Sequence, residues 1–216
     1  MDLLHTLMWY WGNILDYTKE AFPCVVLALV MFGALVPLRR RRLAAQGLHS
    51  GFWREGGLLL FVVFCAGLTA LTLFPSGFWS SAHLGSVLRG ETSLFPPVDW
   101  SLQLQTLQLT PLREIWRAFR GPWVMFLMLA NIGIFIPIGF FPALLWRNWR
   151  LWKAGLLGCL VSCSIECIQF FIGRSTDIDD VILNTTGTIL GFSLFCLIRR
   201  LFPQFVARFQ CAPISL

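Results

Sequence analysis

Five long apolar stretches constrain this sequence more than any other feature, because each is long enough to cross a bilayer as a helix of about 20 residues. Only 13% of the residues are charged and 56% are hydrophobic, which leaves too little polar surface for a soluble domain. The sequence therefore predicts a single membrane domain over residues 1–216, an all-α bundle of about five transmembrane helices. The stretches are expected at about residues 21–38, 57–74, 122–146, 154–173 and 181–198.

Lysines and arginines gather at every second boundary of these stretches. Residues 39–56, 147–153 and 199–216 contain 5, 3 and 3 of the 17 basic residues. Positive residues near the ends of spans are retained on the cytoplasmic side, so these three segments are expected to be cytoplasmic. The amino terminus is then outside and the carboxyl terminus is cytoplasmic. Residues 75–121 and 174–180 are expected to form the extracytoplasmic segments.

Three segments outside the spans have patterns of their own. Apolar residues recur at helical spacing in residues 3–15, which predicts an interfacial helix on the outer face. Residues 102–105 alternate Leu and Gln, which favours a short strand. Pro111 is expected to open an amphipathic helix in the outer loop that leads into the third span. Its polar face carries arginines that either bind lipid phosphates or are solvated beside the headgroups: Arg113, Arg117 and Arg120.

The cysteines do not indicate a disulfide framework, since none of the seven lies in an expected outer segment. Cys159, Cys163 and Cys167 share a helix face, where a metal or redox site could be considered. Small residues at every fourth position are, however, typical of closely packed membrane helices. We therefore interpret these cysteines as packing residues.

The few polar side chains inside the expected spans lie at a similar depth. In hydrocarbon such side chains need a hydrogen-bonding partner or a water-filled cavity, so each of these residues is a candidate functional residue. With a rise of 1.5 Å per residue, all of them are expected within about 5–13 Å of the outer boundary. They are Asn131, Glu166, Gln169 and Asn184.

Helical spacing places polar and small residues on two stripes that can face each other. The stripes are Ser162, Glu166, Gln169 and Gly173 in the fourth span, and Asp180, Asn184, Gly187 and Gly191 in the fifth. Gly187 and Gly191 form a G-x-x-x-G, and a series of small residues runs from Gly155 to Cys163. These small residues predict that the fourth and fifth helices approach each other closely.

The segment between the stripes, residues 173–180, admits two interpretations. Asp177 can cap the fifth helix, with Asp179 and Asp180 favoured near its positive end. This structural interpretation does not account for Arg174, so we favour a functional site over a purely structural polar network. The spacing of the three aspartates matches no cation-binding loop, and no metal is expected.

Three motifs, in order and spacing, resemble the VanZ-like family of small bacterial membrane proteins. They are Leu109-Thr-Pro-Leu112, then Asn131-Ile-Gly-Ile-Phe-Ile-Pro-Ile-Gly139, and then the run Glu166-Cys-Ile-Gln169, Arg174-Ser-Thr-Asp177-Ile-Asp-Asp180 and Asn184-Thr-Thr-Gly187. Leu112 stands where an aromatic residue is common in that family. The resemblance covers a VanZ-like core of about residues 107–193.

The resemblance implies a multi-pass protein of the bacterial cytoplasmic membrane. The family's namesake lowers susceptibility to lipoglycopeptide antibiotics such as teicoplanin. Carried over by position, the polar signature of the family falls on the residues that we expect to form a binding site: Asn131, Glu166, Gln169, Arg174, Asp177, Asp180 and Asn184.

We expect a non-catalytic site in the outer leaflet that binds an amphiphile, either a lipid-linked envelope component or an antibiotic with an acyl chain. Membrane lipids or such an amphiphile are the expected partners. No cofactor and no nucleic acid are expected, and the oligomeric state stays open.

One alternative is a membrane-embedded hydrolase or transferase with Glu166 as general acid or base, although no Ser-His-Asp arrangement accompanies it. Another is a structural partner of a second membrane protein. A transporter or channel is disfavoured, because the polar cluster is shallow.

Overall fold

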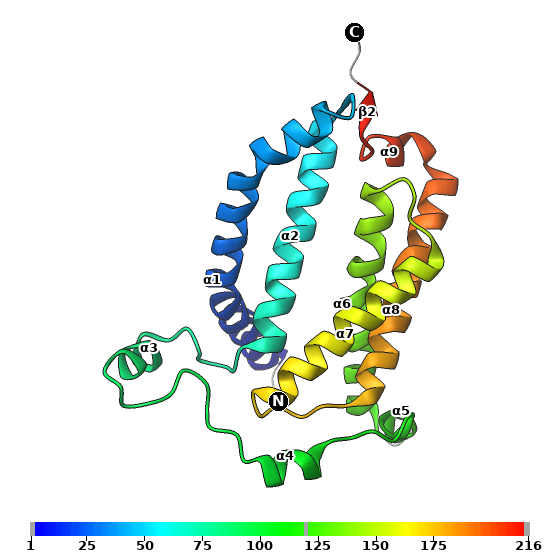
Figure 1. Ribbon diagram of the computed structural model, residues 1–216. Helices are drawn as coiled ribbons and strands as arrows, with labels where there is room; N and C mark the ends of the chain where they lie inside the picture. Colours follow the sequence, from blue (N-terminus) through cyan, green and yellow to red (C-terminus); the bar gives the residue numbers. More distant parts are fainter. Residues whose placement is uncertain (1–2, 119–120, 214–216) are drawn as a thin grey trace.

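The computed structural model describes residues 3–118 and 121–213, and long helices dominate it (Figure 1). Its elements, in chain order, are α1 (Leu3–Ala44), β1 (Leu48–His49), α2 (Phe52–Leu73), α3 (Ser81–Leu88), α4 (Trp100–Thr106), α5 (Arg113–Ala118), α6 (Pro122–Leu145), α7 (Leu151–Phe171), α8 (Ile178–Leu201), α9 (Pro203–Ala207) and β2 (Ala212–Pro213).

Within the described residues, five helices are long and apolar enough to cross a membrane. The candidate spans are Thr18–Ala44 of α1, Phe52–Leu73, Val124–Leu145, Leu151–Phe171 and Ile178–Leu201. The prediction of an all-α membrane bundle with about five transmembrane helices is therefore confirmed.

The bundle consists of a helix pair joined to a group of three helices (Figure 1). In the group of three, α8 packs along both α6 and α7, while α1 packs along α2 in the pair. Helix α2 also contacts α6 and α7, and a buried apolar cluster joins Leu68 of α2 to Phe135 and Ile138 of α6. The polar residues predicted for the site all lie in or beside the group of three.

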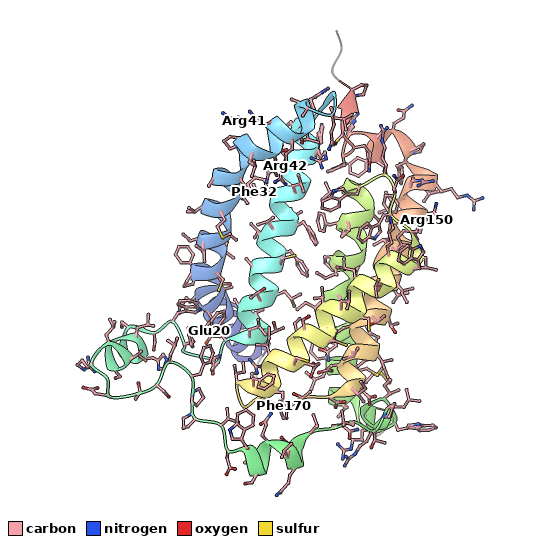
Figure 2. The ribbon with its side chains drawn as sticks, viewed as in Figure 1. Glu20, Phe32, Arg41, Arg42, Arg150 and Phe170 are labelled. Carbon is pink, nitrogen blue, oxygen red and sulfur yellow. The ribbon has the colours of Figure 1, made fainter. Side chains whose placement is uncertain are left out.

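The two ends of the bundle carry different residues (Figure 2). Arg41 and Arg42, in the last turn of α1, lie at the same end as Arg150, and this end is termed the basic end. Glu20 and Phe170 lie toward the opposite end, where α3, α4 and α5 are found, and this is termed the loop end. There Glu20 accepts a hydrogen bond from the backbone nitrogen of Gly77 at 2.8 Å. At the basic end, β1 pairs with β2 in antiparallel register.

The first span and the segment before it form one helix. The sequence predicted an interfacial helix at residues 3–15 and a separate span, whereas α1 runs over 42 residues without a break. At 1.5 Å per residue α1 is about 63 Å long, twice the hydrocarbon core of about 30 Å, so part of it lies outside that core. In Figure 1 the dark blue beginning of α1 turns away from the axis of the rest. Pro23, inside α1, can bend a helix without ending it.

The segment between α2 and α6 contains a helix where the sequence predicted a strand. The carboxylate of Asp99 accepts hydrogen bonds from two backbone N–H groups, at 3.0 and 3.2 Å, and thereby caps α4 over residues 100–106. This cap outweighs a four-residue alternation that has no neighbouring strand to pair with. The predicted helix after Pro111 is present as α5, which begins at Arg113, and Arg120 lies outside the described residues.

Three glycines allow the close contact between α6 and α8. A Cβ atom on Gly139 would overlap the backbone of Thr188 in α8, and a Cβ on Gly187 or Gly191 would overlap the backbone of α6. The G-x-x-x-G of α8 therefore faces α6, and the prediction that it brings α8 against α7 is wrong. Helix α7 meets α8 through Gly158, which lies against the side chain of Thr188.

The buried face of α7 is formed mainly by residues that each precede, by one position, a member of the predicted series of small residues. Its buried side is formed by Ala154, Gly158, Ser162 and Glu166, whereas the predicted series ran from Gly155 to Cys163. Both series repeat every four residues, so spacing alone does not distinguish them. Ser162 and Glu166 need polar partners away from lipid, and this need fixes the rotation of α7.

Candidate functional site

The loop end of α8 is held by a cap and by a backbone pairing. Asp177 is the N-cap, as the sequence predicted, and its Oδ1 accepts a hydrogen bond from the backbone nitrogen of Asp179 at 2.8 Å. The nitrogen of Gln108 donates to the carbonyl oxygen of Thr176, and the nitrogen of Ile178 donates to the carbonyl oxygen of Gln108, both at 3.0 Å. The segment before α5 is thereby docked onto the start of α8.

The other two aspartates of this cluster contact other parts of the molecule. Asp179 is fully buried and accepts a hydrogen bond from the backbone nitrogen of Leu112 at 2.5 Å. Asp180 accepts a hydrogen bond from Nδ2 of Asn131 in α6, also at 2.5 Å. Within the described residues, no group of three or more His, Cys, Asp or Glu side chains is arranged to hold a metal ion.

Asn184 links α8 to α7, one turn further from the loop end. Its Nδ2 donates to the hydroxyl oxygen of Ser162 at 2.9 Å, and both side chains are buried. Thr188, a turn beyond, donates its hydroxyl hydrogen to the carbonyl oxygen of Asn184 at 2.9 Å. Oδ1 of Asn184 has no hydrogen-bond partner among the described residues. Side-chain hydrogen bonds of Asn131 and Asn184 thus cross-link α6, α7 and α8.

Glu166 lies one turn from Ser162 on the buried face of α7, and the residue is only 6% exposed. Its Oε2 accepts a hydrogen bond from the backbone nitrogen of Asp177 at 2.9 Å. The hydroxyl of Thr176 donates to the backbone oxygen of Glu166 at 3.3 Å. These bonds hold the carboxyl group at the junction of α7, the connecting loop and the start of α8.

Two of the predicted site residues point to α2 instead of joining this cross-linked group. Nε2 of Gln169 donates to the carbonyl oxygen of Thr72 at 2.9 Å, and Nη1 of Arg174 donates to the carbonyl oxygen of Phe74 at 3.3 Å. Gln169 follows Glu166 by three residues, which rotates it by about 60° around the helix axis. Their contacts attach α7 and its loop to the end of α2, so the expectation that Gln169 lies on the stripe of α7 that faces α8 is wrong.

A pocket of about 370 Å³ opens beside Glu166 at the loop end. Glu166, Thr176 and Asp177 are among its lining residues, but the surface that the pocket exposes is entirely apolar. Leu109 and Phe171 also line it, and these side chains are 63% and 66% exposed, so the apolar part of the pocket opens on the outer surface of the bundle. Phe170, another lining residue, marks its position in Figure 2. The pocket therefore offers a surface on which acyl chains can pack, with the nearly buried Glu166 directly behind it.

Residues that sequence reasoning missed attach the segment before α5 to the loop between α7 and α8 and to the start of α8. Gln103 donates from Nε2 to the carbonyl oxygen of Arg174 at 2.6 Å, and Gln108 pairs with the loop as described above. Leu112 has a positive φ of 68°, which is uncommon for a leucine, and the buried carboxylate of Asp179 holds its N–H group. The available signal was the Leu109–Leu112 motif, but its partner lies 67 positions away in the sequence.

Comparison with known proteins assigns the chain to a family. The family model described as VanZ/LLP1 matches residues 58–199. The chain belongs to this family. The matched segment includes α6, α7, nearly all of α8 and the pocket beside Glu166, so the resemblance to VanZ-like proteins found in the sequence is confirmed. No curated protein and no solved structure matches the chain.

Proposed function

We propose that this VanZ-like membrane protein binds an amphiphile in the pocket beside Glu166. The observation that carries the proposal is a single cavity of about 370 Å³ in which a nearly buried carboxyl group adjoins an exposed apolar surface. Its volume falls in the range of about 300–1,000 Å³ that is usual for small-molecule sites. In this proposal an acyl chain packs along Leu109 and Phe171, and a ligand hydroxyl or amide N–H reaches the carboxyl group of Glu166 behind that apolar surface.

The other residues of the family signature hold the helices around this pocket in place through hydrogen bonds. Asn131 and Asp180 join α6 to α8, Asn184 joins α8 to α7, and Gln169 and Arg174 attach the pocket to α2. Membrane sites depend on such satisfied polar contacts, because an unpaired polar group in hydrocarbon is costly. In this proposal Glu166 contacts the ligand and the others position it.

The proposed orientation places the pocket in the outer leaflet of a bacterial cytoplasmic membrane. Residues 39–56, 147–153 and 199–216 hold 11 of the 17 basic residues, which supports a cytoplasmic basic end. The amino terminus is then outside and the carboxyl terminus inside. A pocket on that side can take a lipid-linked envelope component or a lipoglycopeptide that arrives from outside, and in this way the protein contributes to teicoplanin-type resistance.

The test measures binding of teicoplanin to the purified protein in neutral detergent. Glu166→Gln replaces one oxygen of the carboxyl group by an NH2 group that cannot accept a hydrogen bond, so it should weaken binding by about 1–3 kcal/mol. Ser164→Ala is the matched control, because the Ser164 hydroxyl bonds only within α7, to the carbonyl oxygen of Leu160 at 2.7 Å, and lies outside the pocket. Equal binding by Glu166→Gln and wild type, or an equal loss in Ser164→Ala, would exclude the pocket as the binding site.

A second candidate function is hydrolysis or group transfer on the same amphiphile, favoured by the position of Glu166 in the wall of a ligand-sized pocket. An acid or base catalyst of this kind accelerates a reaction by about 10²–10⁴-fold. The two functions differ in the fate of the bound compound. Mass spectrometry after incubation should recover it unchanged from both wild type and Glu166→Gln if the site only binds. A product made by the wild type and missing with Glu166→Gln would establish catalysis and contradict the binding proposal.

A further inference from the structure

A second pocket, of about 410 Å³, lies at the basic end of the bundle. Its lining comes from the end of α1, the start of α2, the end of α6 and the carboxyl-terminal segment. Two arginines, Arg54 and Arg147, line it together with the side-chain amides of Gln46 and Asn148. None of its lining residues is acidic. The pocket therefore combines two positive charges with neutral hydrogen-bond donors.

Arg54 carries a buried positive charge that has few hydrogen-bonding partners. The residue is 6% exposed, its Nη1 donates to the hydroxyl oxygen of Ser50 at 3.1 Å, and its Nε has no partner among the described residues. Glu55, the next residue, is engaged elsewhere, because its Oε2 lies 2.6 Å from Nη2 of Arg39. A buried guanidinium is normally paired with an anion. Arg54 forms no ion pair with a carboxylate of the described residues.

Arg147 lines the same pocket and has N–H donors beyond the one that is hydrogen-bonded within the chain. Its recorded hydrogen bond runs from Nη2 to the carbonyl oxygen of Cys211 at 3.4 Å, and a guanidinium has five N–H groups. Two guanidinium groups beside one cavity are the arrangement that holds a phosphate, because each offers paired N–H donors and a permanent charge.

We infer that this pocket binds a phosphate-bearing anion between Arg54 and Arg147. A phospholipid headgroup and a soluble phosphate share this chemistry. The apolar residues of the pocket favour the lipid, since Leu43, Leu145 and Trp146 lie at the ends of transmembrane helices, at the depth where a headgroup continues into acyl chains. The inference is independent of the pocket beside Glu166 and of the orientation of the protein.

Binding at this position joins segments that are far apart in the chain. Gln46 follows α1, Arg54 belongs to α2, Arg147 follows α6 and Cys211 precedes β2. An anion held by these segments binds only the folded chain, so it should raise the thermal stability of the protein.

The test uses the full-length protein in neutral detergent at about 0.15 M salt, where distant charges are screened. The probes are dioleoyl-phosphatidylglycerol, dioleoyl-phosphatidylcholine and inorganic phosphate, with adducts counted by native mass spectrometry and stability followed by the melting temperature. The wild type should retain one phosphatidylglycerol more tightly than phosphatidylcholine. Arg147→Ala, an exposed position that should fold normally, should weaken this binding about tenfold. Arg199→Ala, an exposed arginine of α8 outside this pocket, should change it less than about twofold.

The outcomes separate the two sources of phosphate. Displacement of the lipid by millimolar inorganic phosphate would show that the pocket also takes a soluble anion, and resistance to displacement would assign it to the headgroup; both support the site. Equal retention of phosphatidylglycerol by Arg147→Ala and wild type, an equal loss in Arg199→Ala, or equal retention of the two lipids would overturn it. If Arg54→Gln also folds, it should show the same loss as Arg147→Ala.

Discussion

Asp177, Asp179 and Asp180 are chemically alike and close in sequence, yet each stabilises a different contact. Asp177 caps α8, Asp179 holds the segment before α5, and Asp180 holds α6. Their side chains diverge because successive positions of a helix are separated by about 100° around its axis. The carboxylates therefore act as separate hydrogen-bond acceptors, and substitutions at the three positions should have separate effects.

The hydrogen bond of Asp179 gives the clearest prediction for a single residue. Asp179→Ala removes the buried carboxylate that accepts a hydrogen bond from the N–H group of Leu112, which should lower the free energy of unfolding by about 1–3 kcal/mol. Asp179→Asn keeps an acceptor oxygen and should cost less. Thermal unfolding of the purified variants in detergent measures both. Equal stability of Asp179→Ala and wild type would show that this bond contributes little.

Some of these residue contacts could be predicted from the sequence and others could not. The capping role of Asp177 followed from its position before an apolar run, and the common depth of Asn131, Glu166 and Asn184 followed from counting residues along the spans. The partner of Asp179 did not follow, because the segment that covers the start of α8 belongs to the long connection between α2 and α6. Local pattern carries no information on which distant backbone group meets a buried carboxylate.

At the scale of helices, glycine positions decide which surfaces meet. Helix α8 presents Gly187 and Gly191 to α6, and α6 presents Gly139 to α8, so the two backbones approach more closely than larger side chains would allow. The sequence predicted where the five spans lie, because length and hydropathy are properties of each helix alone. It assigned the glycines to the wrong partner, since a G-x-x-x-G identifies a contact face without naming the neighbour.

A pair of glycines within α6 tests this packing. Gly139→Ala forces a Cβ atom into the backbone of α8 and should destabilise the protein by roughly 1–3 kcal/mol through overpacking. Gly133→Ala places its Cβ where no atom lies within 4 Å, so it should be neutral or stabilise the helix by up to about 1 kcal/mol. Melting temperatures of the two variants in the same detergent make the comparison. A similar loss in both variants would contradict a specific role of the contact with α8, because a Cβ on Gly133 meets no neighbouring atom.

The whole molecule carries its two pockets at opposite ends of one bundle. The pocket beside Glu166 lies at the loop end, where the connection between α2 and α6 folds against α7 and α8, while the pocket beside Arg54 lies at the basic end. In the proposed orientation the first pocket receives an amphiphile from the outer leaflet. Ligand access from outside is therefore the property of the whole molecule on which the proposed function depends.

Two native cysteines allow ligand access to the pocket beside Glu166 to be measured directly. Cys167 and Cys196 are both exposed on transmembrane helices, but Cys167 lines the pocket beside Glu166 and Cys196 lies near Arg199 at the basic end. Right-side-out membrane vesicles are incubated with teicoplanin, then with membrane-permeant N-ethylmaleimide, and alkylation of each cysteine is quantified by peptide mass spectrometry. A glycopeptide without an acyl chain serves as the ligand control.

If the pocket binds an amphiphile from outside, teicoplanin should slow alkylation of Cys167 and leave Cys196 unchanged, and the glycopeptide without an acyl chain should protect neither. Unchanged alkylation of Cys167, or protection that occurs only when teicoplanin is given from the cytoplasmic face in inside-out vesicles, would contradict an outer-leaflet amphiphile site.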